Sequence, residues 1–151
     1  RTHQLGVQFL YSFNVGLSVG LNQYIGTGTP ISTIGGIPTG NLFYPYGRGD
    51  LGDTSTLTQT DLTLWQTFNF GRFDLSLGLT VLNLFDEDTA TRVYTLRQLQ
   101  DIEVTDEDFL TGFDFAEKLA ELPDSALDSA FNMDDTFQQL RRLRLTVKFE
   151  F

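Results

Sequence analysis

The chain has 151 residues, of which 40% are hydrophobic, and it carries a net charge of -10. It contains 14 Phe and 5 Tyr but no Cys, which excludes disulfides, thiolate metal sites and a Cys nucleophile. No run of about 18 apolar residues occurs, so a membrane-spanning helix is excluded. The aromatic, Thr and Gly content favours strands.

The negative charge is concentrated in one part of the chain. Residues 86–135 hold 15 acidic side chains against 3 basic ones, a net charge of -12, whereas the rest holds 5 acidic and 7 basic ones, a net charge of +2. Such an insert argues against a nucleic-acid partner, and it lacks the spacing of a calcium-binding EF-hand. We interpret it as a solvated acidic lid, either bridged by divalent ions to lipopolysaccharide or favouring cationic substrates.

The first predicted element is a hairpin. Residues 2–13 and 15–24 alternate apolar and polar side chains, as strands with two different faces do. Asn14 between them tolerates a left-handed backbone and suits a tight turn. Residues 25–54 are rich in Gly, Thr and Pro and are predicted to form a long loop with a short strand near 41–44.

A second hairpin and an acidic loop follow. Residues 55–70 and 73–85 alternate in the same way, and Gly71-Arg72 is a two-residue turn between them. Residues 86–139 are predicted to form a second long loop with two or three short helices. Capping boxes predict two of the helix starts, one at Thr105 with Asp108 and the other at Ser125 with Asp128.

The last predicted strand covers residues 140–151. Its apolar side chains point one way and charged ones the other, which is how the closing strand of an outer-membrane barrel reads. We interpret four apolar residues as a signal for the barrel-assembly machinery: Leu145, Val147, Phe149 and Phe151. The last strand of a soluble protein could have the same pattern. The chain opens directly into a strand pattern, so we expect a mature piece or a fragment of an exported protein.

The connections alternate between short and long, which places both long loops at one end of the strands. Outer-membrane barrels have this asymmetry, with short periplasmic turns and long extracellular loops. The predicted fold class is therefore all-β: an antiparallel transmembrane β-barrel segment of about five strands, spanning residues 1–151, with a short-helix extracellular insert. Five strands leave two unpaired edges, so we expect the remaining strands on a missing part of the chain or on another chain.

The sequence resembles the C-terminal part of TonB-dependent outer-membrane receptors, specifically the Oar-like group. The most specific match is Asn-Leu-Phe at 83–85 after a long alternating strand. The stretches that carry the resemblance are residues 26–30, 47–62, 81–85, 91–94 and 144–151.

The resemblance implies a barrel of 22 strands with a plug, coupled to TonB, in the outer membrane of a Gram-negative-type bacterium. The expected function is to form barrel wall and extracellular loops for uptake of an unidentified solute. The expected partners are outer-membrane lipid, the remaining strands and plug, the barrel-assembly machinery and, indirectly, TonB. The alternatives are a non-transporting barrel anchor in a larger envelope assembly and a soluble β-sandwich binding module.

Charged and aromatic side chains on the polar side of the strands are the candidates to face the lumen. They are Asp61, Trp65, Asp74, Arg142, Arg144 and Lys148. We favour mutual pairing of the charges or contact with a plug over a substrate path, and for Trp65 a place at the periplasmic rim over ligand stacking. The chain contains a single His and no nucleophile or metal-binding motif. We therefore expect no enzymatic activity, cofactor or metal site.

Overall fold

The computed structural model describes residues 1–151 and consists mostly of antiparallel β-sheet. The chain divides into two compact units rather than one: unit 1 comprises residues 1–28, 55–89 and 137–151, and unit 2 comprises residues 29–54 and 90–136. None of the helices has the length and hydrophobicity needed to cross a membrane.

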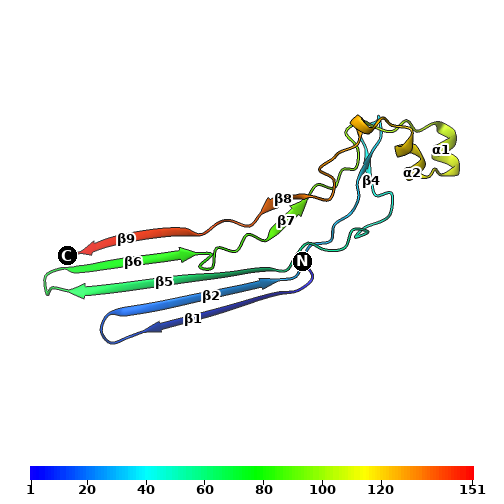
Figure 1. The fold of residues 1–151 in the computed structure, drawn as a ribbon. Helices are drawn as coiled ribbons and strands as arrows, with labels where there is room; N and C mark the ends of the chain where they lie inside the picture. The colour runs from blue at the N-terminus through cyan, green and yellow to red at the C-terminus, as the bar shows by residue number, and fades with distance from the viewer. The chain divides into compact units, whose positions relative to one another are not determined.

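Unit 1 is a five-stranded antiparallel sheet in which each long strand pairs with the next one along the chain (Figure 1). The five predicted long strands are confirmed, with ends that differ from the predicted ones by at most three residues. The strands, in sheet order, are β1 (Gln4–Ser12), β2 (Leu17–Gly26), β5 (Leu57–Asn69), β6 (Asp74–Leu82) and β9 (Arg142–Glu150).

The two tight turns lie at the same end of this sheet. The Phe13 backbone N–H donates to the Leu17 carbonyl over 2.7 Å, which closes the first turn. Its left-handed residue is Gly16, with a φ of 82°, and not Asn14 as the sequence suggested. Gly71, with a φ of 79°, fills the same role in the second turn. Both long connections therefore leave from the opposite end of the sheet, as predicted.

One face of the sheet is apolar and the other is polar. The strand pairing aligns apolar side chains into rows that cross all five strands. One such row is Phe9, Leu21, Leu62, Val81 and Leu143, and the next is Tyr11, Val19, Leu64, Leu79 and Leu145. No second layer covers them within the unit: Leu143 and Leu145 are 71% and 80% exposed, and Val81 is the single buried hydrophobic side chain of unit 1.

Aromatic side chains gather at the end of the sheet that carries the tight turns. Phe70 and Phe73 flank the second turn with stacked rings whose centroids are 4.9 Å apart. Tyr11 and Phe13 meet edge to face at 4.7 Å beside the first turn. The sheet thus has an aromatic margin at its tight-turn end.

Unit 2 is built from both long connections, which the sequence analysis treated as separate loops. Its short elements are β3 (Gly35–Gly36), β4 (Leu42–Phe43), β7 (Ala90–Val93), β8 (Asp134–Phe137), α1 (Asp106–Thr111), α2 (Phe115–Ala120) and a 3-10 turn (Asp124–Ala126). β3 pairs with β4, and β7 pairs with β8. A small core forms between them from Ile31, Val93, Ile102, Phe115 and Ala126.

The caps of the short helices agree with the prediction in one case and not in the other. Thr105 and Asp108 form the predicted capping box at the start of α1. Ser125 is not a cap, because it lies inside the 3-10 turn and Pro123 precedes that turn. Asp128 instead accepts a 2.9 Å hydrogen bond from the Ala130 backbone.

Candidate functional site

The predicted lumen-facing residues share one face of the five-stranded sheet. The pairing places them on the side opposite the apolar rows, as the alternation indicated. On β5 they are Asp61 and Trp65, on β6 Asp74, and on β9 Arg142, Arg144 and Lys148.

Of the predicted residues on this face, Lys148 alone forms an ion pair, and contact with a plug stays a prediction. Asp61 accepts a 2.9 Å hydrogen bond from the Asn83 backbone N–H instead, and Asp74 accepts one from an Asn side chain. Lys148 forms its ion pair with Glu150 on the same strand, at 2.7 Å. The arginines of β9 take part in no ion pair, so this face offers uncommitted positive charge beside hydrogen-bonded carboxylates.

Trp65 lies near the tight-turn end of the polar face, and its ring covers a glycine. The residue pairs with Ser18 on one side and with Gly78 on the other. A Cβ at position 78 would stand 2.3 Å from the indole carbons, so glycine is required for this contact. Packing against the neighbouring backbone accounts for the position of the ring.

The four residues interpreted as an assembly signal lie at the edge of the sheet. Leu145, Val147 and Phe149 stand in line on the apolar face of β9, and Phe151 follows the end of that strand. All four side chains are exposed.

Asn83 is a structural anchor in unit 1. It is 1% exposed and adopts a left-handed backbone with a φ of 53°. Its amide nitrogen donates to the carbonyls of Glu87 and Gln139, each at 2.8 Å, and its amide oxygen accepts from the Glu87 N–H at 3.0 Å. The side chain thus ties the end of β6 to the segment that returns to β9.

Asp50 holds the Gly-rich loop of unit 2 in place. Its carboxylate accepts hydrogen bonds from the backbone and the hydroxyl of Thr33, at 2.8 and 2.5 Å. Desolvation raises the pKa of Asp50, but these hydrogen bonds outweigh it and leave the pKa below its usual value. The neighbouring Arg48 lies over the Tyr44 ring at 5.1 Å. The side chains of Arg48 and Asp50 are therefore both engaged within the loop.

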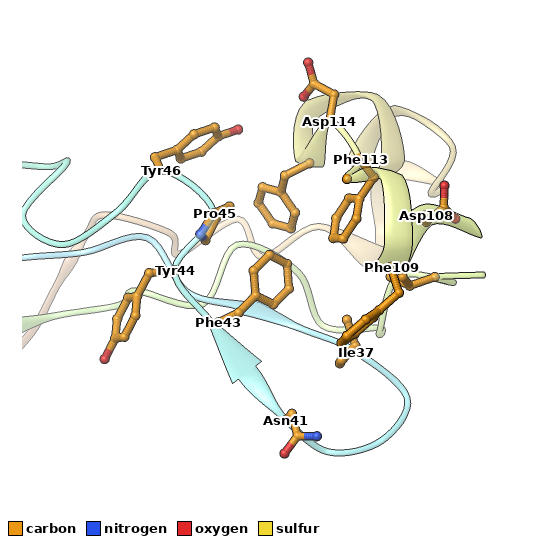
Figure 2. A pocket seen from close by; sticks show the side chains of 13 residues that line it. Ile37, Asn41, Phe43, Tyr44, Pro45, Tyr46, Asp108, Phe109, Phe113 and Asp114 are labelled. Carbon is orange, nitrogen blue, oxygen red and sulfur yellow. The ribbon is translucent and has the colours of Figure 1, made fainter. Parts of the chain in front are cut away.

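Unit 2 contains an open pocket of about 790 Å³ between its two chain segments. We call it the aromatic pocket; it is lined by residues from 41–46 and 104–115 together with Ile37. Figure 2 shows the rings of Phe43 and Phe113 turned toward each other, with Tyr46 on the opposite chain segment from α1 and α2. Its volume falls within the range of small-molecule sites.

The rings of the aromatic pocket contact one another edge to face. Phe43 packs against Phe113 at 5.9 Å and against Phe115 at 5.5 Å, and Tyr46 packs against Phe115 at 5.9 Å. Phe115 is 4% exposed and forms the floor, whereas Phe109 on α1 is 75% exposed at the margin. Partly exposed and exposed rings therefore accompany the buried Phe115 in this pocket.

The charged side chains that line the pocket are both acidic. Asp108 accepts hydrogen bonds from the backbone and side chain of Thr105 and pairs with Lys118 at 3.1 Å. These contacts, in that order, hold the pKa of Asp108 below its usual value, and the bond to Asp108 raises the pKa of Lys118. Asp114 caps α2 by accepting from the Ala116 N–H at 2.7 Å.

No family model, curated protein or solved structure matches this chain. No group of three or more His, Asp or Glu side chains is placed to hold a metal ion. The aromatic pocket was missed in the sequence analysis, although the density of rings in 43–46 and 109–115 was a signal for it.

Proposed function

We propose that this chain is part of a TonB-dependent outer-membrane transporter of a Gram-negative-type bacterium. Unit 1 supplies barrel wall, and unit 2 supplies extracellular loops that receive a solute. The observation that carries the proposal is the apolar face of the five-stranded sheet, where complete rows of Leu, Val and aromatic side chains have no covering layer.

An apolar face of this kind is stable against lipid and unfavourable in water. Each Å² of apolar surface exposed to water costs about 25 cal/mol, and soluble monomers rarely expose contiguous patches beyond a few hundred Å². The opposite face carries the polar and charged side chains suited to a lumen. The aromatic margin at the tight-turn end suits the interface girdle of such barrels.

The outer strands of the sheet support a larger assembly. β1 and β9 each pair on one side only, and every residue of both strands is exposed. Unpaired strand edges are not stable in hydrocarbon. In the proposed barrel, further strands pair with both edges and a plug fills the lumen, either from another part of the same polypeptide or from another chain.

Two observations support transport over simple anchoring: the resemblance to TonB-dependent receptors and the aromatic pocket. A barrel that only anchors an assembly has no use for a cavity of ligand size in its loops. The pocket therefore favours solute uptake over the role of a non-transporting anchor.

Fractionation of cells that produce the protein tests the membrane proposal. We expect the chain to stay in the outer-membrane pellet after washes with alkaline carbonate and with urea, and to dissolve only in detergent. Release as a folded monomer in plain buffer would contradict the proposal and favour the soluble module. In cells that lack TonB, loss of solute uptake supports transport, and unchanged uptake opposes it.

A further inference from the structure

We infer that the aromatic pocket binds an organic cation with a planar or apolar body. The inference deepens the proposed function, because it names the class of solute that the loops receive. The binding itself can be measured whether or not the barrel transports, so the two proposals can fail separately.

The aromatic rings of the pocket suit a cationic ligand. A cation is attracted to the negative face of an aromatic ring within about 6 Å of its centre. Phe43 meets Phe113 and Phe115 edge to face. Phe43 and Phe113 are partly exposed and can meet a ligand, whereas Phe115 is buried. Tyr46 and Phe109 stand exposed at the margin, where they can close over the body of a ligand.

The charge of the pocket also favours a cation. Its lining contains Asp108 and Asp114 and no basic side chain. Lys118 offsets Asp108, which leaves the carboxylate of Asp114 as the main charge for a ligand to meet. Unit 2 as a whole has 14 acidic side chains against 4 basic ones, a net charge of -10, while unit 1 has 6 of each. Such a field concentrates cations near the pocket and repels anions.

The combination of rings and carboxylates selects both parts of the ligand. A bare metal ion would leave the apolar lining unused, and a neutral aromatic molecule would leave the carboxylates unused. The required chemistry can come from a free small cation or from an arginine side chain in a peptide. The open shape of the cavity admits both, so the experiment compares them.

Calorimetric titration of the protein extracted from outer membranes in detergent, with the strands that complete its barrel, provides the test. The small probe is benzyltrimethylammonium, compared with tetramethylammonium, which lacks the ring, and benzyl alcohol, which lacks the charge. The peptide probe is the amide of Phe-Arg-Phe, compared with that of Phe-Gln-Phe. We expect saturable binding of a cationic aromatic probe that weakens with added salt, and binding at least about five times weaker for its partial analogues, as expected from the lost cation–π contacts.

Two pairs of variants distinguish the pocket from the general charge of the unit. Asp114→Asn keeps the helix cap, since Asn also caps helices, and we expect roughly threefold to tenfold weaker binding. Asp124→Asn removes the same charge outside the pocket, and we expect little change. Phe109→Ala is expected to weaken binding roughly twofold to fivefold, whereas Leu110→Ala on the same helix leaves it unchanged.

The relative affinities of the probes assign the source. Tighter binding of the arginine peptide assigns a peptide ligand, and tighter binding of benzyltrimethylammonium assigns a free cation. Absence of saturable binding by both probes would overturn the inference, as would equal binding of benzyl alcohol or equal losses in the Asp114 and Asp124 variants. If binding fails in this way but the protein remains in the outer-membrane pellet, the assignment of the ligand is wrong and the membrane proposal still stands.

Discussion

The indole of Trp65 lies over the backbone of Gly78, its partner on the neighbouring strand, and a side chain on that glycine would meet the ring at 2.3 Å. An added Cβ would come closer to a neighbouring atom here than at any other glycine of the sheet. It fixes the one tryptophan of the chain against the polar face, which makes tryptophan emission a direct reporter of this face.

We predict that Gly78→Ala displaces the indole. The added methyl group cannot fit under the ring, so the emission maximum should shift to longer wavelength as the ring moves into solvent. Overpacking of this kind lowers the free energy of unfolding by about 1–3 kcal/mol. Emission spectra and urea unfolding measure both effects. Gly6→Ala is the matched control, because position 6 lies on the same face with nothing within 4 Å of an added Cβ; an equal shift there would contradict the explanation.

We predict that Asn83→Ala loosens the segment between β6 and β9. The substitution leaves the backbone groups of Glu87 and Gln139 without partners, which lowers the free energy of unfolding by roughly 2–4 kcal/mol. Faster hydrogen exchange at the Glu87 amide reports the loss locally.

Asn132→Ala separates this effect from backbone strain. Asn132 has a similar φ of 62°. Its side chain does not form hydrogen bonds to backbone groups as the side chain of Asn83 does. The left-handed backbone alone should cost about 1 kcal/mol in this variant. Equal destabilisation in both variants would mean that the side-chain hydrogen bonds of Asn83 contribute little.

Acidification should loosen the Gly-rich loop through Asp50. Because its pKa is lower in the folded protein than the ordinary value of 3.8, the folded state binds fewer protons than the unfolded state. The stabilisation is therefore complete above the ordinary value and is lost as the pH falls through the lower, folded pKa. Protection of the Thr33 amide against hydrogen exchange, measured from pH 6 to pH 3, reports this loss.

Asp50→Asn should remove most of that pH dependence, since the amide cannot titrate. Asp53→Asn is the control, because Asp53 lies in the same segment and takes no part in the contact with Thr33. A wild-type pH profile in the Asp50 variant would show that another group controls the loop.

The strands and their faces could be predicted from the sequence because strand side chains alternate with a period of two. That pattern placed Leu145 and Arg144 on opposite faces without any knowledge of their neighbours. The turns were harder to predict: glycine and asparagine both accept a left-handed backbone, and the structure uses Gly16 where Asn14 was expected.

The density of rings in 43–46 and 109–115 was a signal for the aromatic pocket, but its assembly was hard to predict because its walls come from distant parts of the chain. Phe43 and Phe113 belong to two connections that have no periodic pattern, and their contact depends on how both loops fold against a shared core. The partners of the charged side chains on the polar face were hard to predict for a similar reason. Alternation assigns a side chain to a face, but its position along the sheet and its local hydrogen bonds decide which partner it reaches.

The most direct test of the account uses two adjacent positions on β9. The chain has no cysteine, so Leu145→Cys and Thr146→Cys each provide a single label on opposite faces of the same strand. In outer membranes that contain the protein, we predict that Cys at 145 resists a water-soluble maleimide and that a fluorophore attached there is quenched by brominated lipid. At 146 we predict rapid reaction with the maleimide and no quenching by lipid. Equal reaction with the maleimide at both positions, without quenching at 145, would contradict the claim that lipid covers the apolar face.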